Sequence, residues 1–119
     1  MIQIRQHGEN NQLFDMTVFI PFLERRIHII QWEISIEWCT GENSPEVEKS
    51  ADDPWIGNHS QFKTFYRGIF QTIDGEFRIE SKEGWVRMLA VDSSFWEIES
   101  NIPGLESEFL DSFGPYKMH

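Results

Sequence analysis

The chain has 119 residues, of which 39% are hydrophobic and 14% aromatic, and twenty acidic side chains against ten basic ones give a formal net charge of -10. This length fits one domain, with enough apolar surface for a core that needs neither disulfides nor a structural metal. The negative charge disfavours nucleic acid and anionic membranes as partners, because both repel an acidic domain.

Cysteine use and the N-terminal sequence indicate the cell compartment. Cys39 is the single cysteine, so an internal disulfide is impossible and a stapled secreted scaffold is excluded. The first ten residues lack the basic start and apolar run of a secretory signal, and the most apolar early stretch, 16–23, is too short to cross a bilayer. These features predict a cytoplasmic protein.

Two alternating segments occupy the first third of the chain. Every second residue is apolar in 14–20, which predicts a strand with one solvated face. In 30–38, Ile and Trp alternate with Gln, Glu and Ser, which predicts an antiparallel strand with Trp32 and Trp38 on the core side. The isoleucines before it are in the opposite phase, so we expect a bulge near residues 29 and 30.

Segment 41–60 loses this periodicity. Gly, Pro, Asn, Ser and acidic residues dominate it, which predicts a long acidic loop of a length that is usually functional or disordered. Trp55 is its only large aromatic residue. It is interpreted either as an anchor buried in the core or as a contact with a binding partner.

Segment 61–71 is compatible with a helix or a strand. Its aromatic residues have the spacing of one helix face, but Gly68 weakens a helix. The Asp74-Gly75 pair is typical of a tight hairpin turn. We therefore expect a helix over 61–66 and a strand over 68–73 that ends at this turn.

The rest of the chain predicts a meander followed by a helix. Short apolar runs at 76–81, 85–91 and 95–99 are separated by turn residues. Apolar residues then recur at helical spacing over 105–113, with Gly114 as a stop signal. The sequence thus predicts a single domain over 1–119 of the α+β class, mainly β, with an antiparallel sheet of five to six strands and one or two short helices.

The negative charge is unevenly distributed. Residues 41–60 contain five acids and one base, 61–91 four acids and five bases, and 92–119 six acids and one base. Such clusters either keep the protein soluble or are complementary to a basic partner. The predicted partner-binding residues are Glu42, Glu46, Glu48, Asp52, Asp53, Trp55, Glu97, Glu99, Glu106, Glu108 and Asp111.

No residue pattern predicts a chemical reaction. His7, His28, His59 and His119 share no metal-ligand spacing, and Cys39 has no local partner that would form a zinc pattern. The chain contains no phosphate-binding glycine loop, serine elbow or dinucleotide fingerprint. The sequence therefore predicts no catalytic residue, cofactor or metal.

In size, acidity, lack of an export signal and β-rich pattern, the chain resembles the small acidic immunity proteins that bacteria pair with toxins, including those of contact-dependent growth inhibition systems. The resemblance implies a cognate protein toxin as partner, a basic nuclease being the first expectation, with no direct contact to nucleic acid or membrane. It transfers no functional residue. Two alternatives stay open: a small-ligand-binding or other interaction β domain without catalysis, with Trp55 and its loop over a pocket in the ligand-binding case, or an enzyme using Asp52, Asp53 and His59.

Overall fold

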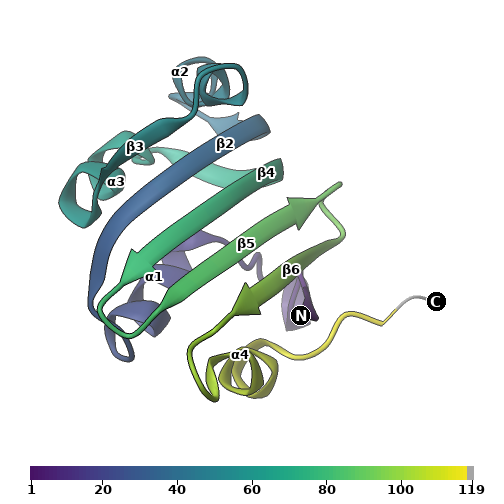
Figure 1. Ribbon diagram of the computed structural model, residues 1–119. Coiled ribbons are helices and arrows are strands. Elements are labelled where there is room, and N and C mark those ends of the chain that lie inside the picture. The colour runs from purple at the N-terminus through teal and green to yellow at the C-terminus, as the bar shows by residue number, and fades with distance from the viewer. Residues whose placement is uncertain (118–119) are drawn as a thin grey trace.

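The computed structural model describes residues 1–117 and contains one antiparallel sheet in the order β1-β6-β5-β4-β2-β3 (Figure 1). The strands are β1 (Ile2–Arg5), β2 (Ile29–Gly41), β3 (Trp55–Asn58), β4 (Ile69–Ser81), β5 (Trp85–Val91) and β6 (Phe95–Ser100). The helices are α1 (Met16–Glu24), α2 (Ser44–Glu48), α3 (His59–Phe65) and α4 (Leu105–Phe113), with short 3-10 turns at Glu9–Asn11 and Lys49–Ala51.

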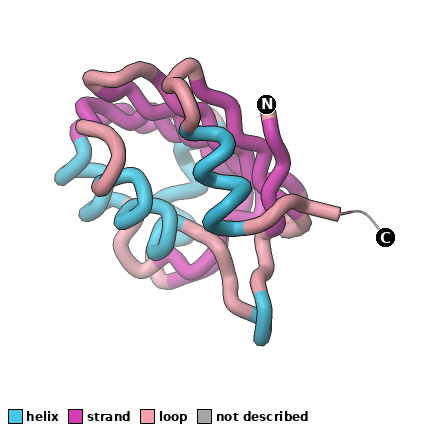
Figure 2. Tube along the Cα trace, turned by 90° about the horizontal axis from the view of Figure 1, so that it is seen from below, coloured by secondary structure: helices cyan, strands magenta, loops and turns pink. Residues whose placement is uncertain are grey.

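The helices that build the core, α1, α3 and α4, pack on one face of the sheet. In Figure 1, α1 and α3 lie behind the strands, and Figure 2 shows most helical segments on one side of the strand layer. Helix α2 lies instead beside the edge of β2. The opposite face of the sheet carries no helix among the described residues, and we call it the open face.

Aromatic side chains join these helices to the sheet. Phe62 of α3 stacks on Trp32 of β2 with ring centroids 3.8 Å apart, and Phe19 of α1 meets Trp96 of β6 edge-on at 5.2 Å. Phe109 of α4 lies 6.0 Å from Phe19, so α4 is joined to α1. Burial of such large apolar rings is strongly favourable for folding.

The predicted fold class is confirmed: the protein is α+β and mainly β, with a six-stranded antiparallel sheet and a helix near the C-terminus. The meander of β4, β5 and β6 is present with β5 at its predicted bounds. Helices α3 and α4 lie close to their predicted positions. Strand β1 had no counterpart in the sequence prediction; it pairs with β6 at the sheet edge.

The strand predicted for 14–20 is wrong, because this segment forms most of helix α1. The Asp15 side chain accepts a hydrogen bond from the backbone N–H of Met16 at the start of the helix. The buried residues are Met16, Phe19, Phe22 and Leu23, and their spacing of three to four is the helical period. Capping and core contacts thus override the apparent alternation.

The long loop predicted for 41–60 is also wrong. The segment forms α2, a 3-10 turn and the edge strand β3. Beyond the four residues that pair with β3, the edge of β2 is covered by α2 and the 3-10 turn. The backbone N–H of Ile36 donates to Ser50 Oγ at 2.9 Å, and that of Cys39 donates to Glu48 Oε2 at 3.0 Å. These acceptors satisfy strand groups that would otherwise be exposed to edge pairing.

Two further differences occur along the central strands. The predicted turn at Asp74-Gly75 is absent, because β4 runs continuously through it and Gly75 lies opposite Ile36. A Cβ at Gly75 would come within 3.0 Å of Ile36 and Thr72, so close packing explains the glycine. The expected bulge near residues 29 and 30 is confirmed, but a second irregularity around Trp38 leaves that side chain 53% exposed instead of in the core.

Ser50→Ala tests the covered edge of β2. Ser50 Oγ is buried, accepts from Ile36 and donates to the Val47 carbonyl at 2.6 Å. We expect this substitution to lower the free energy of unfolding by about 1–3 kcal/mol, because it leaves a buried N–H without a partner. Urea denaturation with the matched control Ser60→Ala, at an exposed position, measures the difference; equal midpoints for the two variants would contradict it.

Candidate functional site

The two predicted acidic clusters lie on separate surfaces. Glu42, Glu46, Glu48, Asp52 and Asp53 surround α2, beyond the edge of β2. The later cluster lies on β6 and α4, and strands β4 and β5 separate β6 from β2 in the sheet. The structure therefore does not bring the clusters together into one patch.

Several of the predicted binding residues already have hydrogen-bond or ion-pair partners inside the protein. They are Glu46 with Lys49 Nζ at 2.9 Å, Glu48 with the Cys39 N–H at 3.0 Å, Glu106 with the N-terminal amine at 3.1 Å, and Glu108 with Arg26 Nε at 2.6 Å. Glu42, Asp52, Asp53, Glu97, Glu99 and Asp111 make no such side-chain contact within residues 1–117.

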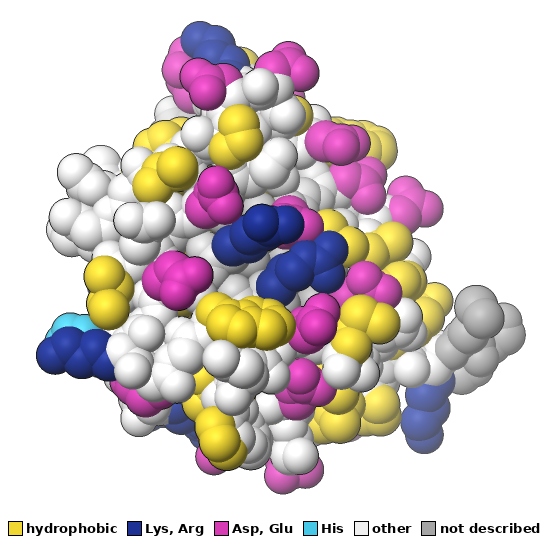
Figure 3. Space-filling view, viewed as in Figure 1, with side chains coloured by type: hydrophobic (Ala, Val, Ile, Leu, Met, Phe, Trp, Pro, Cys, Tyr) yellow, Lys and Arg dark blue, Asp and Glu magenta, His cyan; other side chains and the backbone are white. Residues whose placement is uncertain are grey.

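The open face carries acidic side chains from three strands, β2, β4 and β6. Residues directly opposite one another on neighbouring strands share a face, and three such rows cross the sheet. The rows are Ile56, Glu33, Arg78, Arg87 and Glu99; then Ser35, Glu76, Leu89, Glu97 and Gln3; then Asn58, Gln31, Glu80 and Trp85. Figure 3, which looks onto this face, shows basic side chains surrounded by acidic and apolar ones.

Glu76 is the centre of the charged network on this face. It accepts from Arg78 Nε at 2.5 Å and forms an ion pair with Arg87 at 3.0 Å. The two arginines face each other across β4 and β5, and like charges in that position repel. Glu76 compensates this repulsion, so both guanidinium groups are already paired and the other carboxylates of the face dominate its charge.

Next to this network, the open face has an acidic hollow of about 380 Å³. Glu37, Asp74 and Glu76 stand around it, and Leu89 and Val91 give it apolar walls. With Glu37 and Asp74 included, the open face carries seven carboxylates against two guanidinium groups. Apart from Glu97 and Glu99, its acids were not among the predicted binding residues, because they are spread over strands that lie far apart in the chain.

Trp55 lies in an edge strand and not in a loop over a pocket. It pairs opposite Ile34 on the core side and stacks on Phe65 of α3 at 4.5 Å, so it anchors β3 to α3. A shallow hollow of about 410 Å³ beside it is lined by Ile56, Gln61 and other residues. The anchor interpretation accounts for this packing, whereas a Trp55 loop covering a ligand has no counterpart in the structure.

His59 is engaged by Trp32 and Glu24. The Trp32 indole N–H donates to Nδ1 of His59 at 3.0 Å, which leaves Nε2 to donate to Glu24 at 2.8 Å. The structure gives no contact of His59 with Asp52 or Asp53, the partners expected for an enzyme. Within the described residues no three His, Cys, Asp or Glu side chains are arranged to hold a metal; His119 lies outside this part.

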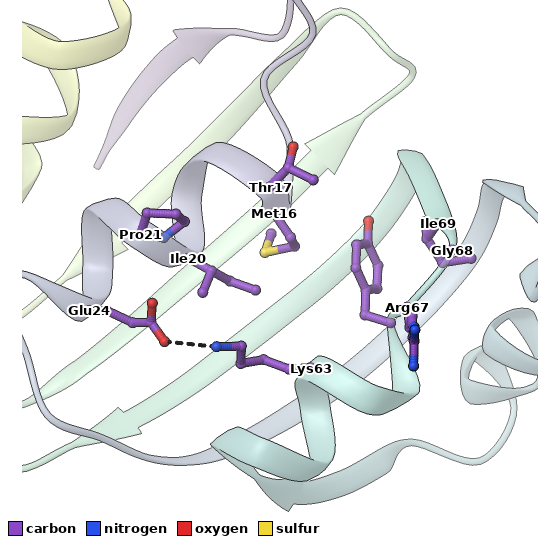
Figure 4. A pocket seen from close by; sticks show the side chains of 10 residues that line it. Met16, Thr17, Ile20, Pro21, Glu24, Lys63, Arg67, Gly68 and Ile69 are labelled. Atoms are coloured by element: carbon purple, nitrogen blue, oxygen red, sulfur yellow. Dashed lines mark hydrogen bonds and ion pairs between the residues drawn. The ribbon is translucent and has the colours of Figure 1, made fainter.

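A cleft lies between α1 and α3 (Figure 4), with a volume of about 320 Å³. Its floor and walls are mainly apolar, and Lys63 of α3 reaches across it to Glu24 of α1 at 3.3 Å. Its lining residues are Met16, Thr17, Ile20, Pro21, Glu24, Lys63, Tyr66, Arg67, Gly68 and Ile69. The sequence prediction contained no such cleft, because it treated the residues of α1 as a strand.

A buried carboxylate lies behind the cleft. Asp15 is 2% exposed and accepts from the backbone N–H of Met16 and of Thr72 and from the Tyr66 hydroxyl, at 2.6 to 2.8 Å. Burial raises the pKa of Asp15 to about 6, although these hydrogen bonds oppose the shift. Every polar group of this cluster is satisfied, which indicates a structural role for it.

Cys39 is buried at the end of β2. Burial, with Glu48 and Asp15 as neighbouring charges, raises the pKa of its thiol to about 12. The thiol therefore stays protonated at neutral pH, which does not favour a nucleophile.

No protein-family model matches the chain, and comparisons with curated proteins and with solved structures find no match either. None of the helices in residues 1–117 is long and apolar enough to span a membrane. The functional argument therefore depends on the surfaces described above.

Proposed function

We propose that the protein is a cytoplasmic immunity protein of the contact-dependent growth inhibition type, which binds a basic protein toxin and neutralises it without catalysis. A nuclease is the expected toxin, because an enzyme that binds phosphates must present lysine and arginine side chains. A rigid acidic domain can occupy such a basic site in place of the nucleic acid. The partner is recognised by protein contacts, with no cofactor, nucleic acid or membrane involved.

The open face is the observation that supports this proposal. Seven carboxylates lie on or beside it, with two guanidinium groups paired to Glu76. Trp85 and Ile56 are 37% and 57% exposed at its borders, and exposed aromatic and apolar groups among charges are typical of protein interfaces. Glu97 and Glu99 belong both to this face and to the predicted binding residues.

Two variants with equal charge change test which surface meets the partner. Glu33→Gln, Glu97→Gln and Glu99→Gln neutralise three carboxylates of the open face; Glu42→Gln, Asp52→Asn and Asp53→Asn neutralise three beside α2. The partner is captured on the immobilised protein, identified by mass, purified and measured by stopped-flow association. We expect the open-face variant to associate with the partner about tenfold more slowly than the wild type at low salt. The α2 variant should change the association rate less.

The neutralising role is tested with the purified partner. Its toxic activity, nucleic-acid cleavage for a nuclease, should be lost on addition of one equivalent of wild-type protein and recovered as salt is raised. A partner that binds without being inhibited would contradict the immunity role. Association rates that do not depend on salt in wild type or variants would contradict electrostatic recognition.

A further inference from the structure

The cleft between α1 and α3 combines an apolar floor with basic groups at its mouth. Met16, Tyr66 and Ile69 are buried below it, and Ile20 and Pro21 form the α1 wall. Its volume of about 320 Å³ is at the lower end of the range of small-ligand sites, roughly 300–1,000 Å³. It has space for the apolar body of a small molecule.

Two cations lie beside this apolar space. Lys63 of α3 and Arg67 of the turn that follows the helix both line the cleft. The Arg67 guanidinium makes no hydrogen bond or ion pair within the described residues. In a protein with twice as many acids as bases, this mouth holds two cations and, in the described lining, one carboxylate, that of Glu24.

The Glu24 carboxylate has a second hydrogen-bond partner besides Lys63. His59 Nε2 is 2.8 Å from the Glu24 carboxylate, whereas Lys63 is 3.3 Å away. The hydrogen bond from His59 is the main reason that the pKa of Glu24 is lowered. Lys63 and Glu24 are both substantially exposed, so their ion pair is weak. Lys63 can therefore turn to a ligand while Glu24 keeps His59.

The backbone at Arg67 is fixed before any ligand arrives. Asn43 Nδ2 donates to the Arg67 carbonyl at 2.8 Å, and the N–H of Glu42 donates to the Gly68 carbonyl at 3.1 Å. These bonds tie the turn after α3 to the segment after β2. A site held in this way loses less conformational entropy on binding.

From this geometry we propose that the cleft binds a small organic anion. Its apolar body lies on Met16, Ile20 and Tyr66, and its single carboxylate or sulfonate is placed between Lys63 and Arg67. This site is on the helical side of the sheet, opposite the open face, so it does not depend on the proposed toxin partner.

Two fluorescent probes with the same aromatic skeleton test the charge requirement: 1-anilinonaphthalene-8-sulfonate and the neutral N-phenyl-1-naphthylamine. We expect saturable binding of the sulfonate to the wild-type protein, with a dissociation constant on the order of 10–100 µM. Amide NMR shifts should change at Met16, Ile20, Tyr66 and Ile69. Shifts confined to the open face or to the hollow beside Trp55 would overturn the proposal.

Variants at exposed positions distinguish recognition of the probe's charge from recognition of its shape. Lys63→Gln with Arg67→Gln should weaken the sulfonate roughly three- to tenfold and leave the neutral probe unchanged. Thr17→Glu places a carboxylate at the mouth, near the start of α1 where helices favour an acid, and should weaken the sulfonate more than Thr17→Gln does. Arg78→Gln on the open face is the matched control and should change neither probe. Equal affinities across the charge variants would overturn the anion site.

Discussion

Replacing Asp15 by Ala should lower the free energy of unfolding by about 2 kcal/mol at pH 7. The substitution removes the acceptor for two backbone N–H groups, those of Met16 and Thr72, and each unpaired buried donor costs about 1–3 kcal/mol. The Tyr66 hydroxyl retains Thr72 Oγ1 at 2.5 Å, so it does not add fully to the loss. Urea denaturation of both proteins measures the effect.

The effect of Asp15→Ala should grow as the pH falls from 7 to 4. The pKa of Asp15 is raised from 3.8 to about 6 in the folded protein, so the folded state binds more protons than the unfolded state between these values. Stability from this group is therefore present at low pH and lost as pH rises through about 6. The full shift corresponds to about 3 kcal/mol. Because the unfolded carboxyl is itself partly protonated at pH 4, about 2 kcal/mol of this is present there, giving a total difference of about 4 kcal/mol.

The comparison with Tyr66→Phe isolates the role of the carboxylate. This variant removes the hydroxyl that lowers the pKa of Asp15, but it keeps the carboxylate and both backbone hydrogen bonds. Its stability should therefore still depend on pH in the same direction as that of the wild type. A difference between wild type and Asp15→Ala that is constant from pH 4 to pH 7 would show that Asp15 does not titrate in this range.

Replacing Phe62 by Ala should destabilise the fold by about 4 kcal/mol. Phe62 is fully buried, with its ring stacked on Trp32 at 3.8 Å and edge-on to Phe77 at 6.2 Å. Truncation of a buried aromatic side chain removes its burial and leaves a cavity, which together cost about 3–5 kcal/mol. Because α3 forms one wall of the cleft, the variant should also lose binding of the anionic probe.

Phe70→Ala is the matched control, since Phe70 is 68% exposed. Its free energy of unfolding should stay within about 0.5 kcal/mol of the wild-type value. Should Phe62→Ala fail to fold, Phe62→Leu keeps most of the apolar volume and gives a smaller, measurable loss. Equal stability of the Phe62 and Phe70 variants would contradict the central place of Phe62 in the core.

Where local signals agree with the tertiary environment, the sequence predicts the structure closely. Strand β5 has an alternating pattern with turn residues on both sides, and its inward residues Val86, Met88 and Ala90 are buried as the pattern requires. Helix α4 has the helical spacing of Leu105, Phe109 and Phe113. In both elements the spacing of apolar residues matches the single face that packs on the core. Tertiary contacts therefore reinforce the local preference for strand or helix.

The candidate sites were less predictable than these elements. Glu97 and Glu99 were expected to bind a partner, but Glu33, Glu37, Asp74 and Glu76 reach the same face from other strands. Glu48 and Glu106, also predicted for binding, accept backbone hydrogen bonds within the fold. Sequence gives the number of charges along a segment, whereas strand pairing decides which of them are neighbours.

The class of the protein follows from composition and local pattern: an acidic α+β chain with an antiparallel meander, a closing helix and no recognisable catalytic motif. Tertiary contacts were needed to show that Met16–Glu24 is helical, because its aromatic side chains pack against the sheet and α4. The tertiary structure also decided that Trp38 faces solvent, because the register with β4 shifts there. Local patterns fix the period of an element, but the face that becomes buried depends on contacts far apart in the chain.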